Sequence, residues 1–108
     1  MATSAGMSTR RSRRTASPQD DELQAALDVV SDPVRRSVLR QLAGQPDWAI
    51  ACGTFELSVS KSTLSHHFTV LVKSGLLEQR EQGTRKLNRL NRADYDRRFP
   101  GLLDLILR

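Results

Sequence analysis

The sequence predicts a mainly α-helical fold with one small β-hairpin. Two helix starts are marked in the same way, by a capping residue followed by proline, at residues 17–18 and 32–33. Apolar residues then recur at helical spacing, and a third such segment, residues 60–75, ends on a glycine. After this glycine the pattern around "EQGT" changes to alternation, which is typical of two strands joined by a tight turn.

Length and composition predict one small domain preceded by a tail. The chain has 108 residues, and its hydrophobic fraction of 38% is low for a globular protein. Residues 1–17 are rich in Ser, Thr, Ala and Arg and show no apolar period, so we expect them to form a disordered basic tail. Residues 18–108 are then expected to form the folded domain.

The segments before residue 60 supply most of the predicted core. The first helix has an apolar stripe of Leu23, Ala26, Leu27 and Val30. The second has an apolar face of Val34, Val38, Leu39 and Leu42. We expect Gly44 to end the second helix in a left-handed cap. The short apolar segment "WAIACGTFEL" predicts a third helix of about two turns, with Trp48, Ile50 and Phe55 in the core.

The helix predicted after the cap Ser60, in "SKSTLSHHFTVLVKSGLL", has two chemically different faces. Its apolar face contains Leu64, Phe68 and Leu71, with His67 beside them. Its opposite face carries Ser62, Ser65, His66, Thr69 and Lys73. Ser and Thr are mediocre helix formers because they compete for backbone hydrogen bonds. A row of them on one face therefore indicates a surface that binds something outside the protein.

The hairpin and the C-terminal segment complete the predicted domain. Gly83 can take the positive φ of a tight turn, and the second strand is expected to end early because Leu87 and Leu90 do not alternate. Basic residues lie near or just beyond the tip: Arg80, Arg85, Lys86 and Arg89. A final helix is expected from about residue 92, interrupted by Pro100. Its aliphatic end exceeds what a small core absorbs, which indicates an interface.

The charge distribution indicates a polyanionic partner. Residues 60–92 carry a net charge of +5 and residues 1–19 a net +4, whereas residues 20–59 carry −4 and residues 93–108 are neutral. Helices, a donor-bearing helix and a basic hairpin in this order predict a winged helix-turn-helix that places the donor face in the major groove of double-stranded DNA. The expected DNA contacts are Lys61, Ser62, Thr63, Ser65, His66, Thr69, Lys73, Arg80, Arg85 and Lys86.

Three stretches resemble the ArsR family of bacterial transcriptional repressors: "SDPVRRSVLRQL", "SKSTLSHHFTVLVKSGLL" and "EQGTRKLNRLN". The resemblance covers about residues 20–107. It implies a homodimer joined by the first and last helices, which binds a palindromic operator and is released by an inducer. The expected dimer contacts are Leu23, Leu27, Leu102, Leu103, Leu105 and Ile106. Two-fold symmetry places the half-sites about 34 Å apart, one helical turn of DNA.

The chain departs from the metal-sensing members of that family. Many of them use a Cys-x-Cys pair before the helix-turn-helix or His and acid ligands on the last helix, but here only Cys52 stands near the first place and the last helix has no histidine. His66 and His67 point about 100° apart on a helix and cannot share one site. We therefore expect no metal and no cofactor. A redox switch at Cys52 remains an alternative, and the inducer is unknown.

Other function classes are less well supported. No glycine-rich phosphate loop and no nucleophile paired with a base is found, so no enzyme is expected, and the acids Asp94 and Asp96 sit at a helix start. Non-specific or architectural nucleic-acid binding and a protein-docking module remain alternatives. No apolar run approaches the roughly 20 residues of a membrane span, and no secretory signal is seen. A single cysteine favours the reducing cytoplasm.

Overall fold

The computed structural model describes residues 17–51, 55 and 59–108. The tail predicted for residues 1–17 and the thiol of Cys52 lie outside the described residues, apart from Ser17. The elements, in chain order, are α2 (Pro18–Val30), α3 (Pro33–Ala43), β1 (Ile50–Ala51), α4 (Lys61–Lys73), β2 (Leu77–Gln82), β3 (Arg85–Leu90), α5 (Arg92–Arg98) and α6 (Leu102–Ile106). The mainly helical fold with a small β-hairpin is the one predicted, and β1 adds a third strand that was not predicted.

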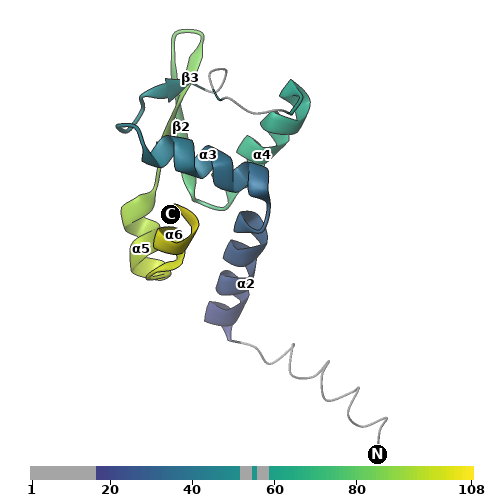
Figure 1. Cartoon of the computed structure of the whole chain (residues 1–108), viewed down its shortest axis with the longest axis vertical. Helices are drawn as coiled ribbons and strands as arrows, with labels where there is room; N and C mark the ends of the chain where they lie inside the picture. The colour runs from purple at the N-terminus through teal and green to yellow at the C-terminus, as the bar shows by residue number, and fades with distance from the viewer. Residues whose placement is uncertain (1–16, 52–54, 56–58) are drawn as a thin grey trace, which may run out of the picture.

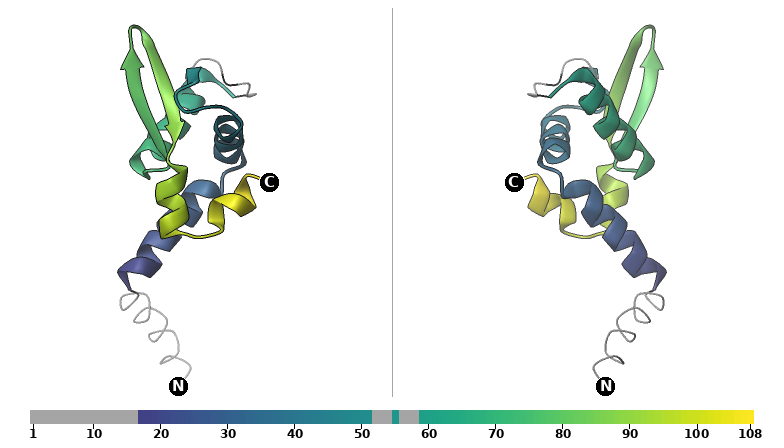
Figure 2. Two further views of the ribbon diagram at one scale, coloured as in Figure 1. Left: turned by 90° about the vertical axis from the view of Figure 1, so that its left-hand side faces the viewer. Right: turned by 90° about the vertical axis from the view of Figure 1, so that its right-hand side faces the viewer.

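Helix α3 crosses the middle of the domain (Figure 1). The hairpin β2–β3 projects from one side of α3, and helices α2, α5 and α6 lie toward the opposite end of the molecule (Figures 1 and 2). Helix α4 lies on the same half of the molecule as the hairpin. The domain therefore presents α4 and the hairpin together, away from the N-terminal and C-terminal helices.

The predicted helix starts are confirmed by their hydrogen bonds. The hydroxyl of Ser17 accepts from the backbone N–H of Asp20 at 3.2 Å, and that of Ser60 accepts from Thr63 at 3.2 Å. One carboxylate oxygen of Asp32 accepts from the N–H groups of Val34 and Arg35. These side chains satisfy amide groups that a helix N-terminus leaves without partners.

Two glycine positions show where the sequence patterns hold and where they fail. Gly75, after α4, has φ of 83° and ends the helix in the left-handed region, as expected. Gly44, after α3, has φ of −82° and ψ of 0°, so the expected left-handed cap is wrong. Its N–H continues the helical pattern by donating to the carbonyl of Arg40, and a right-handed end needs no glycine.

The sheet is antiparallel and has the strand order β1-β3-β2. The helix expected over "WAIACGTFEL" is wrong at Ile50 and Ala51, which form β1 and pair with Asn88 and Leu87. Asn88 is 1% exposed, and its amide donates to the carbonyl of Ile50 at 2.8 Å. The side chain of Asn88, which lies far away in the sequence, thus helps to hold β1 in an extended conformation.

Strand β3 continues to Leu90, so the early end expected for this strand is wrong. Leu87 and Leu90 lie three residues apart and therefore on opposite faces of the strand. Both are buried, Leu90 in the main core and Leu87 on the other face of the sheet. Lost alternation here reflects burial on both faces rather than the end of the strand.

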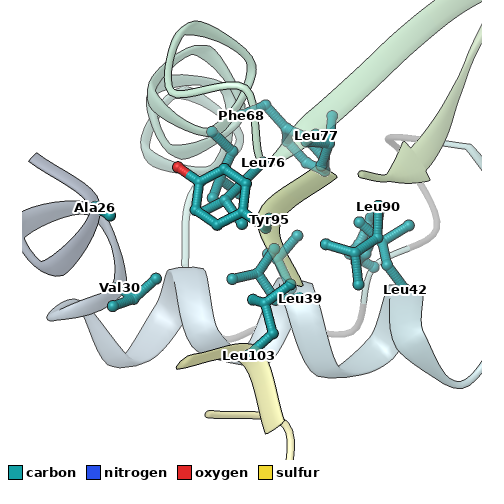
Figure 3. Close-up of a cluster of buried hydrophobic side chains, with 13 residues drawn as sticks. Ala26, Val30, Leu39, Leu42, Phe68, Leu76, Leu77, Leu90, Tyr95 and Leu103 are labelled. Carbon is teal, nitrogen blue, oxygen red and sulfur yellow. The ribbon is translucent and has the colours of Figure 1, made fainter. Parts of the chain in front are cut away.

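The core joins every helix to the sheet (Figure 3). Leu39 of α3 and Leu71 of α4 are fully buried, as is Leu103 of α6. Tyr95 of α5 is also buried, and its hydroxyl donates to the carbonyl of Ser74 at 3.1 Å, which ties α5 to the end of α4. Leu103, expected at a dimer surface, therefore packs inside its own chain, because Pro100 and Gly101 (φ of 87°) turn α6 back onto α3.

Candidate nucleic-acid interface

The outward face of α4 is exposed to solvent. All of the α4 residues predicted to contact DNA are exposed: Lys61, Ser62, Thr63, Ser65, His66, Thr69 and Lys73. The opposite face packs on the core through His67, Phe68 and Leu71. The helix therefore presents hydroxyl, imidazole and ammonium groups on one side only.

Part of the polarity at the start of α4 has a structural cause. The hydroxyl of Ser60 caps the helix, donates to the hydroxyl of Thr63 at 2.9 Å and lies 3.2 Å from that of Ser62. Further along, the hydroxyl of Thr69 donates to the carbonyl of Ser65 at 3.1 Å. Among the described residues, the side chains of Ser65 and His66 form no hydrogen bond. These two groups are the ones most available to an external ligand.

The hairpin carries cations in three different situations. Arg89 lies 3.3 Å from a carboxylate oxygen of Asp47 and 3.4 Å from one of Glu78, so its charge is largely compensated. Arg80 stacks over the ring of Trp48. Arg85 and Lys86, at the exposed end beside Gly83, have no carboxylate at ion-pair distance within the part of the chain that the structure describes. Of these four cations, only Arg89 is therefore paired with carboxylates among the described residues, and Arg85 and Lys86 at the tip have no such partner there.

Sequence reasoning missed the role of Trp48, which was expected in the core. Trp48 is only half-buried and has φ of 65°. Its backbone N–H donates to the carbonyl of Asn88 at 2.9 Å, and its ring holds the guanidinium of Arg80. The expected DNA contact Arg80 is thus exposed, but its guanidinium stacks on the body of the domain.

Sequence reasoning also assigned no function to Arg35. Its guanidinium lies 3.2 Å from the Nδ1 atom of His67 and donates to the carbonyl of Val29 at 2.6 Å. The nearby carboxyl of Asp32 has a pKa below its usual value: burial alone would raise it, but two backbone N–H groups and the nearby side chains of His67 and Arg35 outweigh that effect. Only the tertiary structure brings this cluster together.

A groove of about 340 Å³ lies beside the C-terminal end of α4, between α2 and α5. Its floor is apolar and includes Ala26, Val29 and Val70. Its rim includes Lys73 and the ion pair between Glu22 and Arg98, at 3.6 Å. The groove therefore borders both α4, whose outer face is exposed, and α2.

The exposed apolar side chains lie on the helices distant from the hairpin tip, apart from Val72 of α4. Leu23 and Leu27 of α2 are each 41% exposed, and Leu105 of α6 is 64% exposed. Leu102 and Ile106 are half-buried against the core. Of the residues expected at a dimer interface, Leu23, Leu27 and Leu105 are the ones that a partner could reach most directly.

Neither a cluster of metal ligands nor a membrane-spanning helix is found among the described residues. No group of three or more His, Cys, Asp or Glu residues converges there, and the rings of His66 and His67 lie on different faces of α4 with centroids 5.9 Å apart. None of the described helices is long and apolar enough to cross a bilayer.

Comparison with known proteins gives a family match that covers α3, α4 and the start of β2. Residues 30–80 match a family described as a helix-turn-helix domain. The fold is a winged helix-turn-helix. A segment of 53 residues is 34% identical to an uncharacterized HTH-type transcriptional regulator of Methanocaldococcus jannaschii, covering 49% of this chain. The match spans 60% of the length of that protein.

Proposed function

We propose that the chain is a sequence-specific DNA-binding transcriptional regulator that acts as a homodimeric repressor. The single observation that carries this proposal is the exposed donor face of α4, which belongs to a winged helix-turn-helix and contains no acid. A helix fits the major groove of B-DNA, where base edges offer acceptors that hydroxyl, imidazole and ammonium groups can meet.

The two parts of the interface are proposed to have different roles. Ser65 and His66, whose side chains are free within the described structure, are proposed to contact base edges. Arg85 and Lys86 at the hairpin tip, together with Lys61 and Lys73, are proposed to contact phosphates, because uncompensated cations bind the backbone irrespective of sequence. This division of roles predicts that mutations of Ser65 and His66 alter specificity, whereas mutations of the four cations alter affinity for all DNA.

The homodimer is proposed to form through α2 and α6. Exposed leucines on both helices, Leu23, Leu27 and Leu105, support this arrangement because exposed large apolar side chains are candidates for an interface. A two-fold dimer would present two copies of α4 to a palindromic operator. The dimer, the repressor role and release by an inducer are the properties that the resemblance to the ArsR family implies.

Selection of bound sequences from a random double-stranded DNA library tests the proposal. The expected result is a palindromic motif whose half-sites are separated by about one helical turn of DNA. Enrichment of a motif without two-fold symmetry would contradict the dimer. Recovery of unenriched sequence would instead favour the alternative of non-specific or architectural binding. The alternative of a redox-responsive repressor rests on Cys52, which lies outside the described residues.

A further inference from the structure

The C-terminal end of α2 is capped by two arginines of the next helix. A helix leaves its last four carbonyl groups without partners inside the helix. In α2 these are the carbonyls of residues 28–31. Arg35 donates to those of Asp28 and Val29, at 3.3 and 2.6 Å, and Arg36 donates to those of Val30 and Ser31, at 2.8 and 2.9 Å. All four carbonyls are therefore satisfied from α3.

Arg35 extends this cap to α4. Its Nη1 atom lies 3.2 Å from Nδ1 of His67, which is 7% exposed. A guanidinium has donors and no acceptor, so Nδ1 of His67 accepts this hydrogen bond. The imidazole is then neutral and carries its proton on Nε2. One guanidinium thus joins the end of α2, the start of α3 and the inner face of α4.

This contact links two helices, α2 and α4, that have different proposed roles. Helix α2 is proposed to join the two subunits and α4 to enter the major groove, so the angle between them sets the spacing of the two recognition helices. We propose that Arg35 and His67 form a positioning pair that holds α4 at the angle required by the operator, and that protonation of His67 releases it and weakens binding. This inference rests on the proposed function.

Protonation changes the contact from attraction to repulsion. A proton on Nδ1 turns the acceptor into a donor, so the hydrogen bond is lost and two positive charges face each other about a hydrogen-bond length apart. Protonation of His67 is therefore expected to loosen the contact between α2 and α4.

The other charged groups around His67 do not remove this effect. The carboxylate of Asp32, the cap of α3, would favour a protonated His67. However, this carboxylate already accepts hydrogen bonds from the N–H groups of Val34 and Arg35. From α2, Arg35 contacts the carbonyls of Asp28 and Val29, and within the described part of the chain no carboxylate of α2 lies at ion-pair distance from it. The pKa of Asp32 is lowered, so this carboxyl stays ionised above pH 5. On α4, the neighbouring group is His66.

The chain contains only two histidines, His66 and His67, which permits a clean test. Affinity of the full chain for its selected operator is measured at pH 7.5 and pH 5.5. His66→Asn serves as the background, because protonation of an outward imidazole would itself strengthen binding to DNA. In this background we expect acid to weaken binding about fivefold or more. His66→Asn/His67→Asn should lose this dependence, since the amide oxygen of asparagine can accept from Arg35 without titrating.

Two further measurements keep the test decisive if the double variant does not fold. Arg35→Lys in the His66→Asn background keeps the charge but cannot bridge three acceptors, so it should bind weakly at pH 7.5 and lose little more at pH 5.5. Nitrogen-15 NMR of the wild-type chain without DNA should show His67 with its proton on Nε2. A proton on Nδ1 at pH 7.5, or equal acid dependence in the single and double variants, would overturn the inference. Failure of every variant and of the wild type to prefer the operator over random DNA would overturn the proposed function instead.

Discussion

The guanidinium of Arg80 lies over the ring of Trp48, with its central carbon 4.3 Å from the ring centroid. This cation–π pair joins the hairpin to the turn before β1. Trp48 holds the turn from both sides, since its N–H also pairs with Asn88 in β3. The hairpin is therefore braced at its middle, and its tip extends beyond this brace.

Two substitutions of Trp48 test its backbone conformation, because both remove the ring but only one of the new residues tolerates a positive φ. At φ of 65°, alanine is strained by about 1 kcal/mol whereas glycine is not. We therefore expect Trp48→Gly to be more stable than Trp48→Ala, the reverse of the usual order at an exposed position. Chemical denaturation of both variants measures the difference. A more stable alanine variant would mean that the turn does not hold this backbone conformation in solution.

Ser65 and His66 should control specificity. Ser65→Ala and His66→Ala are each expected to weaken operator binding by about 1–3 kcal/mol, because each removes a hydrogen-bonding group from the outward face of α4. The fold should be unchanged, since both side chains are exposed. Fluorescence titration against operator and random DNA is the measurement, and an equal loss on both would argue against base readout.

Arg85 should control the salt dependence of binding. Arg85→Ala is expected to lower affinity for all sequences and to reduce the slope of log affinity against log salt by about one. Arg89→Gln is the matched control, because Asp47 and Glu78 already compensate its charge. Titrations over a series of salt concentrations should show the smaller change for Arg89. An unchanged slope in the Arg85 variant would remove the hairpin tip from the interface.

Leu105 and Leu103 should have opposite effects on assembly and stability. Leu105→Glu is expected to yield a folded monomer in sedimentation experiments, because it places a charge on the exposed apolar surface of α6. Leu103→Ala removes a fully buried side chain and should lower the free energy of unfolding by about 2–5 kcal/mol. A dimer that survives Leu105→Glu, Leu23→Glu and Leu27→Glu together would exclude this surface.

Asp32 should contribute stability that depends on pH. Asp32→Ala removes the cap of α3 and should cost about 1 kcal/mol at neutral pH. Because the pKa of Asp32 is lowered by folding, the ionised carboxylate stabilises the fold above its ordinary value of 3.8, and this contribution disappears as pH falls through the lower folded value. The difference between wild type and variant in denaturation should therefore shrink below pH 4. A constant difference would assign the effect to packing alone.

The parts of the fold that the sequence predicted are those determined by neighbouring residues. The caps Ser17, Asp32 and Ser60 act within three residues of themselves, and the two faces of α4 follow from helical periodicity. Strand β1 was missed because Ile50 is held extended by the side chain of Asn88, 38 residues away. The Arg35–His67 contact was missed for the same reason, since it spans 32 residues.

The candidate site also combines features set by the local sequence with features set by contacts between distant residues. The exposure of Ser65 and His66 could be predicted from spacing alone, whereas the charge available on the hairpin could not. Arg80 and Arg89 are occupied by Trp48 and by Asp47 and Glu78, and these partners lie in the turn before β1 and in the neighbouring strand. The composition counts all of these cations alike. Only the structure shows which of them contact a carboxylate or an aromatic ring.

Helix α2 depends on residues outside itself for its last turn. Because Arg35 and Arg36 satisfy the carbonyls at its end, a peptide of residues 17–31 should fray there in isolation, whereas one extended to residue 44 should not. We therefore expect the two helices to form cooperatively, and an insertion between Ser31 and Pro33 to uncouple them even though it leaves every core leucine in place.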